Sequence, residues 1–186
     1  MWIGSWEEGL FRVKADGTIE NFKYNAKDPH SLSSNFVRAC CEDNLGNIWI
    51  GTFNGLNRYN KITGLFQNHT ANDTQADGLT HSSIWCIVKD NQGTLWLGTY
   101  FGGVNYFNPE YEIYTRYSYS SNEKKGLSNP VVGRTIEDKD GNLWIGTEGG
   151  GLNYYNRRTR EFKWYRPQEG RNSISHNNVK ALYYDA

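Results

Sequence analysis

A four-residue segment recurs four times along the chain at an almost constant spacing. It reads Trp-Ile-Gly-Ser once and then Trp-Ile-Gly-Thr or Trp-Leu-Gly-Thr, and it begins at Trp2, Trp49, Trp96 and Trp144. Successive tryptophans are 47, 47 and 48 residues apart. A fixed period of this length indicates structural units that stack on one another and bury a core only together. We therefore expect one array of four repeats.

Each repeat contains four short stretches with the composition of β-strands. A mostly apolar stretch ends in an acidic residue, and a glycine turn leads to the stretch that carries the tryptophan. A third stretch such as Gly-Leu-Asn-Arg-Tyr and an aromatic fourth stretch complete the unit, with Gly, Asn or Asp at the breaks. Four antiparallel strands in about 47 residues match one blade of a β-propeller. The prediction is an all-β fold, with residues 1–186 forming a single β-propeller or partial propeller of four blades.

The two ends of the chain bear on how this array closes. The sequence starts with a second stretch, Trp2 onward, and its last stretch, residues 179–185, has the pattern of a first stretch. Pairing the two would complete the first blade and cover its edge. The alternatives are an open arc, as a fragment of a larger propeller, and an eight-bladed ring made by two chains. An unpaired arc exposes apolar faces, so the expected partner is a second copy or neighbouring repeats of a longer chain.

Charge and hydropathy exclude several classes of partner. The chain has 20 basic and 20 acidic residues, and its formal net charge is zero. No nucleic-acid partner is therefore expected. No apolar run approaches the roughly 18 residues needed to cross a bilayer, so we expect no membrane insertion either.

Two sets of repeated polar residues are candidates for a catalytic or metal-binding role. Asp43, Asp90 and Asp138 each begin a D-x-x-G turn, where the carboxylate is expected to bind backbone N–H groups. His81 and His176 occupy equivalent loop positions, and a shared metal is the alternative to a plain loop role. Neither histidine has a cysteine or acid at ligand spacing. The prediction is no metal, no cofactor and no catalytic residue.

The repeat resembles a known family. Its order V-x-x-x-x-E-D-x-x-G-N-L-W-I-G-T-x-x-G-G-L-N-x-Y is similar to the two-component regulator propeller repeat, most closely over residues 131–165 and then 37–59. The repeat around Trp96 departs at Lys89 and Gln92, and the first repeat has Phe11-Arg12-Val13 in place of Asn-x-Tyr. The resemblance implies the periplasmic sensor region of a bacterial hybrid two-component system, often from Bacteroidetes. Such sensors detect oligosaccharides, signal to a downstream kinase and carry more repeats than four.

Positions that differ between the repeats are the candidates for ligand binding. In propellers, the loops that enter first strands and the corners between second and third strands share one face. Here that face would gather aromatic rings and hydrogen-bonding groups, which suit a sugar ring and its hydroxyls. The alternative is that these rings seal contacts between blades or meet another protein. The predicted ligand-binding set is Trp6, Glu7, Asn35, Arg38, Phe53, Trp85, Tyr100, Phe101, Arg134 and Glu148.

These observations predict a non-catalytic sensor propeller that binds an oligosaccharide. A protein-interaction scaffold is the alternative function. A third class, an enzyme such as a propeller lyase or hydrolase, requires a convergent acid and base, and the sequence offers no such pair above its background of loop residues.

Overall fold

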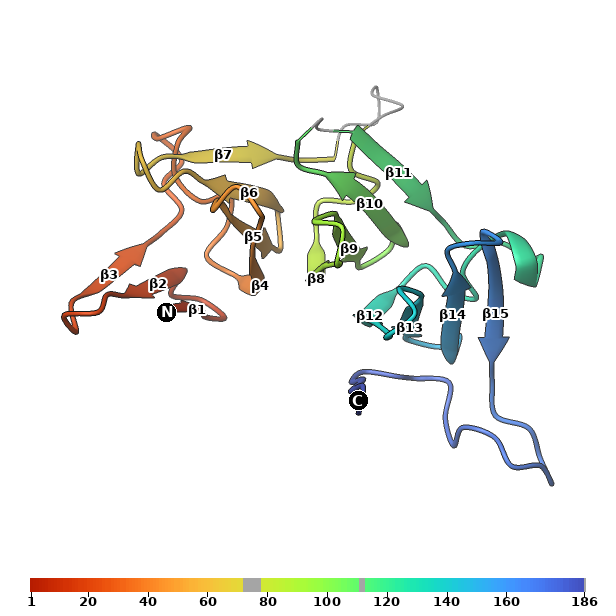
Figure 1. Ribbon diagram of the computed structural model, residues 1–186. Coiled ribbons are helices and arrows are strands. Elements are labelled where there is room, and N and C mark those ends of the chain that lie inside the picture. The colour runs from red at the N-terminus through yellow and green to blue at the C-terminus, as the bar shows by residue number, and fades with distance from the viewer. Residues whose placement is uncertain (72–77, 111–112, 186) are drawn as a thin grey trace.

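Four antiparallel sheets lie side by side in an arc (Figure 1). The computed structural model describes residues 1–71, 78–110 and 113–185. The strands are β1 (Trp2–Gly4), β2 (Leu10–Val13) and β3 (Ile19–Phe22) in blade 1; β4 (Val37–Glu42), β5 (Ile48–Thr52), β6 (Gly55–Tyr59) and β7 (Phe66–His69) in blade 2; β8 (Ile84–Lys89), β9 (Leu95–Thr99), β10 (Val104–Asn108) and β11 (Ile113–Tyr117) in blade 3; β12 (Val132–Glu137), β13 (Leu143–Thr147), β14 (Leu152–Asn156) and β15 (Glu161–Tyr165) in blade 4.

Within each blade, strand order follows chain order. The sheets of blades 2 to 4 have four strands, and the sheet of blade 1 has three, β1-β2-β3. The first strands lie on the inner side of the arc, where β4 contacts β8 and β8 contacts β12 (Figure 1). The predicted all-β fold of four repeated antiparallel blades is confirmed, in the form of a partial propeller.

The chain end differs from the predicted closure of blade 1. Residues 179–185 form no strand, and the backbone N–H of Val179 donates to the Thr147 carbonyl of blade 4 at 2.9 Å. Asn178 forms an isolated bridge with Glu148 of the same blade. The segment is thus held at one end of the arc, while β1 lies at the other (Figure 1). The structure has the open arrangement, and residues 179–185 do not pair with β1.

Neighbouring blades meet at the glycine of each repeated tetrapeptide. A Cβ atom on Gly51 would lie 2.7 Å from Cγ2 of Ile84, the first residue of β8. The same relation joins Gly4 to Val37, Gly98 to Val132 and Gly146 to Val179. Only a residue without a side chain lets the backbones come this close. The glycine recurs because it sets the distance between blades.

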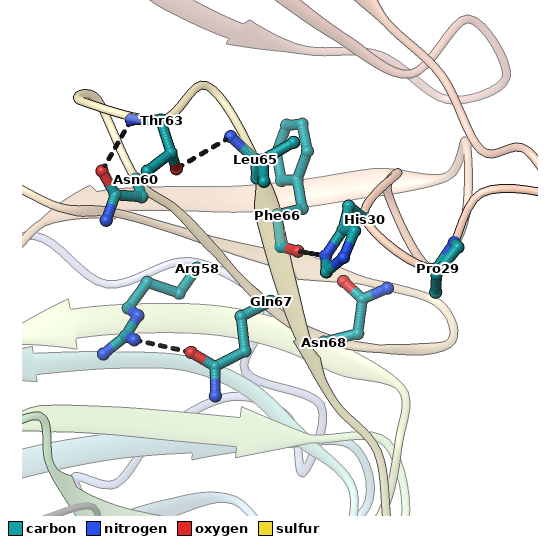
Figure 2. A pocket seen from close by; sticks show the side chains of 9 residues that line it. All are labelled: Pro29, His30, Arg58, Asn60, Thr63, Leu65, Phe66, Gln67 and Asn68. Atoms are coloured by element: carbon teal, nitrogen blue, oxygen red, sulfur yellow. Dashed lines mark hydrogen bonds between the residues drawn. The ribbon is translucent and has the colours of Figure 1, made fainter.

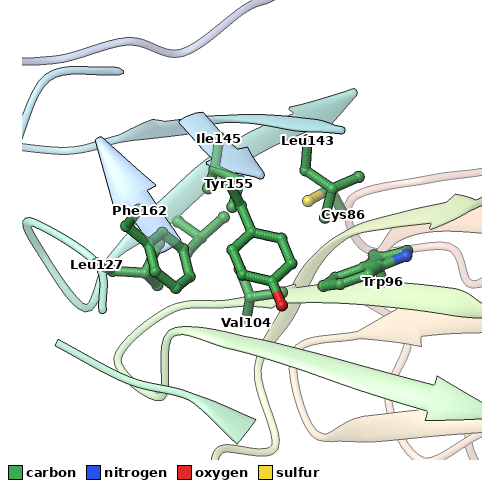
Figure 3. Packing of buried hydrophobic residues seen from close by; sticks show 9 residues of the cluster. Cys86, Trp96, Val104, Leu127, Leu143, Ile145, Tyr155 and Phe162 are labelled. Carbon is green, nitrogen blue, oxygen red and sulfur yellow. The ribbon is translucent and has the colours of Figure 1, made fainter. Parts of the chain in front are cut away.

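The repeated tryptophan fills the wedge beside that glycine, as predicted. Trp49 is fully buried, and its ring meets Phe107 of blade 3 edge-on with centroids 5.0 Å apart. Trp2 contacts Tyr59 of blade 2 at 5.1 Å in the same way. Between blades 3 and 4, the ring of Tyr155 lies between Phe162 and Trp96 (Figure 3). Trp2, Trp49 and Trp96 thereby each join their own blade to the next, whereas Trp144 contacts Tyr154 and Tyr165 of its own blade.

The most completely buried strands are β5 and β9, the second strands of blades 2 and 3. Every residue of these two strands is buried, whereas the first strands β4 and β8 also contain half-buried and exposed residues. The apolar composition of the first strands predicted continuous burial there. They line the inner side of the arc, which leaves one of their faces only partly covered.

The repeated aspartates stabilise turns, as predicted. Asp43 Oδ1 accepts hydrogen bonds from the backbone N–H groups of Leu45 and Asn47, at 2.9 and 2.8 Å. Its Oδ2 accepts the indole N–H of Trp49 at 2.7 Å. Asp90 and Asp138 bind Trp96 and Trp144 in the same way. The carboxylate therefore fixes both the turn and the tryptophan that seals the blade.

The histidines also have local backbone roles. Nδ1 of His81 accepts the N–H of Ser83 at 3.0 Å, and Nδ1 of His176 accepts that of Asn178 at 2.9 Å. In the described ranges, no group of three or more His, Cys, Asp or Glu side chains is arranged to hold a metal ion. No described helix has the length and apolar character needed to cross a bilayer.

Replacing Gly51 by alanine should push blades 2 and 3 apart. We expect Gly51→Ala to lower the free energy of unfolding by about 1–3 kcal/mol, because the new methyl group overlaps Ile84. Denaturant unfolding followed by tryptophan fluorescence measures the change. Ile84→Ala in the same protein removes the overlap, so the double variant should be more stable than the two single effects predict. Strictly additive effects would contradict the contact.

Replacing Asp43 by asparagine should weaken the turn and the tryptophan contact together. The amide nitrogen faces N–H donors, so Asp43→Asn should lower the free energy of unfolding by about 1–3 kcal/mol. Asp16→Asn is the matched control, since Asp16 lies on an exposed turn and accepts the Thr18 N–H. Equal effects of the two substitutions in thermal unfolding would refute a special role for Asp43.

Candidate functional site

Each first strand opens with a β-bulge, and the extra residue occupies the same place in every repeat. The pairing of β4 with β5 skips Arg38, that of β8 with β9 skips Trp85, and that of β12 with β13 skips Gly133. Lys180 has the corresponding position after Val179. A bulge bends the strand and redirects the extra side chain. The blades thus present a row of bulge side chains where their first strands begin.

A second row comes from the corners that follow the repeated tetrapeptide. Trp6, Phe53, Tyr100 and Glu148 occupy equivalent places there. The N–H of Tyr100 donates to the Ser83 carbonyl at 3.0 Å, and that of Phe53 donates to the Phe36 carbonyl at 3.0 Å. These bonds tie each corner to the residue just before its first strand. The corner row and the bulge row therefore lie beside each other, as the sequence predicted.

The two rows meet in a continuous arrangement of Trp6, Arg38, Trp85 and Tyr100, which we call the arginine–aromatic stack. Cζ of Arg38 lies 3.8 Å from the ring centroid of Trp85 and 4.7 Å from that of Trp6. The ring of Trp85 is almost parallel to that of Tyr100, at 12° and 5.4 Å. A guanidinium this close to indole faces is attracted by their negative electrostatic potential. The stack crosses blades 1, 2 and 3.

Two hydrogen-bond donors inside the stack have no acceptor. Nε of Arg38 and Nε1 of Trp85 are buried and make no hydrogen bond within the described part of the chain. Burial lowers the pKa of Arg38, against the opposing influence of Tyr100 and Glu148, and the guanidinium stays charged. A buried donor without an acceptor costs about 1–3 kcal/mol unless water or a ligand provides one. The stack is therefore suited to a ligand that brings oxygen atoms.

Exposed rings surround the stack. Trp6 is 59% exposed, Phe53 53% and Phe101 57%. Phe101 meets Tyr100 edge-on with centroids 4.3 Å apart. Phe36, which was not in the predicted set, has its ring centroid 5.5 Å from that of Trp6 and 6.2 Å from that of Phe53. Its signal in the sequence is an aromatic residue immediately before a first strand.

Four residues of the predicted set lie apart from the stack. Glu148 forms an ion pair with Lys180 at 3.7 Å on blade 4, although its charge is felt at Arg38. Asn35 Oδ1 accepts the Tyr24 N–H at 2.7 Å, which is a structural role. Glu7 is exposed at the blade 1 corner, and Arg134 is exposed one place after the bulge, where Gly133 has no side chain to contribute. Ligand binding by any member of the set stays a prediction.

A hollow of about 390 Å³ lies elsewhere, on the outer part of blade 2 (Figure 2). Its polar side chains bond with the protein itself. Arg58 donates to Gln67 Oε1 at 2.6 Å, and Nδ1 of His30 lies 3.4 Å from the Phe66 carbonyl oxygen. We therefore place the candidate site at the arginine–aromatic stack.

Two substitutions of Arg38 should separate its packing from its unbonded donor. Arg38→Ala loses the contacts with both indoles and should lower the free energy of unfolding by about 1–2 kcal/mol. Arg38→Met keeps much of the packing and removes the buried N–H, so it should be at least as stable as the parent protein. Thermal unfolding measures both. A methionine variant as unstable as the alanine variant would contradict an unsatisfied donor.

Comparisons with known proteins bear on the identity of the repeats. The family model described as two component regulator propeller matches residues 31–54, 78–101 and 126–149. Each match runs from the loop before a first strand to the corner after the tetrapeptide. No curated protein matches the chain.

Solved structures with similar folds include an extracellular domain of a putative two component system and an enzyme. The extracellular domain of a putative hybrid two component system from B. thetaiotaomicron has a TM-score of 0.72 and 20% identity, over 99% of this chain and 29% of that one. A virginiamycin B lyase from Staphylococcus aureus has a TM-score of 0.64 and 14% identity, over 91% of this chain and 52% of that one. This chain thus spans less than a third of the first and about half of the second.

Sequence identities of 20% and 14% show a shared fold only. The type of repeat is shown by the family model. The matched segments contain the features that hold the blades together: the first strands, their bulges, the aspartate turns and the tryptophan-glycine tetrapeptide. The chain therefore carries two-component regulator propeller repeats.

Proposed function

We propose that this protein is a ligand-binding sensor propeller of a bacterial two-component regulator, and that the arginine–aromatic stack recognises an oligosaccharide. The observation that carries the proposal is the pair of buried donors, Arg38 Nε and Trp85 Nε1, which lack acceptors between aromatic faces. The type of repeat supports the sensor role. The similar structure from B. thetaiotaomicron is an extracellular domain, which supports a periplasmic location.

The chemistry of the stack suits a sugar. The C–H face of a pyranose packs on aromatic rings, and its oxygens accept hydrogen bonds from N–H donors. Trp6 and Phe101 offer exposed rings beside the two donors. A glycan of several units can contact the exposed rings of the rim, and a shift of the stacked side chains then brings its oxygens to the two buried donors.

The position of the stack suits signalling to a downstream kinase. Trp6, Arg38 and Trp85 belong to three consecutive blades, so an occupant touches all three. A ligand shifts a protein between two arrangements only if its affinities for them differ. Small changes in the angle between blades alter these contacts and so provide that difference.

A non-catalytic role fits the groups near the stack. Glu148 is engaged by Lys180, and His81 accepts a backbone N–H, so neither side chain is poised as a free acid or base. The similarity to lyases is one of fold. The exposed rings of Trp6, Phe53 and Phe101 favour a second candidate, a protein-interaction scaffold. A second copy or further repeats of a longer chain are the partners we propose for the two ends of the arc.

Variants that remove one donor at a time test the proposal. The purified protein is titrated calorimetrically with a panel of plant and host oligosaccharides. Trp85→Phe keeps a ring but loses the N–H, and Arg38→Lys keeps the charge but loses Nε–H. Each should weaken binding about tenfold or more, while the folded spectrum is retained. Arg158→Lys, at an exposed arginine outside the predicted set, is the control and should bind like the parent protein.

Several results would overturn the proposal. Failure of every oligosaccharide to bind would count against the sugar, and binding unaffected by both variants would count against the stack. Release of cleaved products from a bound glycan would contradict a non-catalytic role.

A further inference from the structure

Strand β1 corresponds to the second strands of the other blades, and it is the edge strand of its sheet. In blade 2 the equivalent strand β5 is covered on that side by the first strand β4. Ile3 of β1 is 43% exposed, whereas its counterparts Ile50 and Leu97 are fully buried. Blade 1 therefore presents a free edge and an apolar residue that fit a first strand.

Cys40 on β4 shows the same opening from the side of blade 2. Cys40 is exposed, although Thr135, which has the same place in β12, is fully buried. The first strand of the preceding blade makes the difference, because Sγ of Cys86 on β8 lies 3.8 Å from Oγ1 of Thr135. A first strand in blade 1 would cover Cys40 in the same way with its third residue.

Residues 179–185 have both the sequence and the docking of a first strand. They read Val-Lys-Ala-Leu-Tyr-Tyr-Asp, and residues 37–43 of blade 2 read Val-Arg-Ala-Cys-Cys-Glu-Asp. The N–H groups of Val179 and Val37 each donate at 2.9 Å to the carbonyl of the last residue of a tetrapeptide, in blades 4 and 1. Beyond Val179 the segment forms no strand, and Tyr183 is 88% exposed. It is a first strand in place beside blade 4, without a second strand to pair with.

We infer that residues 179–185 of one copy complete blade 1 of a second copy, and that two copies exchange these segments reciprocally. The inference rests on the partner proposed above for the ends of the arc and commits to one, a second copy of this chain. Within one chain the segment and β1 lie at opposite ends of the arc (Figure 1). A second copy gives each of them the strand that it needs, and exchange of identical elements is a common route to dimers.

The pairing register follows from that of β4 on β5. Ala39 pairs with Gly51 and Cys40 with Ile50, after a bulge at Arg38. Transferred to the exchanged strand, this register sets Ala181 opposite the partner's Gly4 and Leu182 opposite the partner's Ile3. The bulge falls at Lys180. Ala181 then has the place of Cys86 in blade 3 and faces the partner's Cys40.

The exchanged strand also provides a hydrogen-bond acceptor for Trp2. Trp49 donates its indole N–H to Asp43 at 2.7 Å, and Trp96 donates to Asp90 at 2.8 Å. Within the residues that the structure describes, the indole N–H of Trp2 makes no hydrogen bond. Asp185 is exposed in the single chain, and in the exchanged strand it takes the place that Asp43 has in blade 2.

A disulfide between copies tests the inference directly. Ala181→Cys places a thiol beside the partner's Cys40, because the equivalent side chains of Cys86 and Thr135 approach to 3.8 Å. After mild oxidation we expect a covalent dimer on a non-reducing gel. Light scattering of the unmodified protein over a range of concentrations should show the mass of two copies. Ala181 is exposed in the single chain, so the substitution should not impair folding.

Two control variants locate the crosslink. Lys180→Cys introduces a thiol at the bulge, one residue away, and should form no crosslink. Ala181→Cys combined with Cys40→Ser should lose the crosslink. Equal crosslinking by Lys180→Cys would overturn the register. A monomer at every concentration would overturn the exchange in favour of neighbouring repeats, a disulfide within one chain would overturn it in favour of self-closure, and an open-ended ladder of oligomers would overturn the reciprocal pair.

A substitution of Asp185 tests the predicted hydrogen bond with the partner's Trp2. Asp185→Asn should raise the dissociation constant of the dimer about tenfold, because the charged acceptor is lost. Asp140→Asn, at an exposed aspartate of blade 4, is the matched control and should leave the dimer unchanged. Equal effects of the two would contradict the bond. These measurements contain no oligosaccharide: a dimer that binds none would overturn only the proposed ligand, and a monomer that binds one would overturn only the strand exchange.

Discussion

The contact on which the rest of the structure depends is that between a glycine in one blade and the first β-branched residue of the next. Gly51 against Ile84 shows it: the absence of a side chain on one partner lets the branched side chain of the other lie directly on the backbone. This fixes the distance between sheets, and at that distance Trp49 reaches Phe107. The separation also brings bulge side chains of neighbouring blades into contact. The stack of Arg38 on Trp85 is a product of blade spacing.

The sequence predicted the fold well because the residues that repeat are the residues that make the contacts. Three residues act together in each blade: Asp43 fixes the turn, Trp49 fills the space between blades, and Gly51 sets their spacing. A chain that repeats these residues at a fixed period therefore repeats the blade. Which of the three arrangements of the chain ends is adopted was not predictable in this way, and in the structure residues 179–185 do not pair with β1. Whether the ends of an arc meet depends on the sum of the angles between blades, and this sum cannot be read from any single residue.

The site was only partly predictable, for a local reason. Alternation of side chains does not reveal a bulge, because the first strands are apolar on both sides. Arg134 lies apart from the stack because Gly133 occupies the bulge, and Phe36, which was not in the predicted set, lies beside Trp6. Arg38, Trp85, Trp6 and Tyr100 were identified correctly as neighbours because they stand at equivalent points of different repeats. The unbonded donors became visible only with coordinates.

The bulges separate the residues that vary on the surface from the residues that build the blade. A bulge residue lies outside the regular pairing of its sheet, so arginine, tryptophan, glycine and lysine all occupy that place without changing the blade. The surface that the bulges form can therefore vary one repeat at a time while the scaffold stays constant. Duplication of a repeat adds a new variable position together with a new blade. Such an arrangement allows the chemistry of this surface to change faster than the architecture.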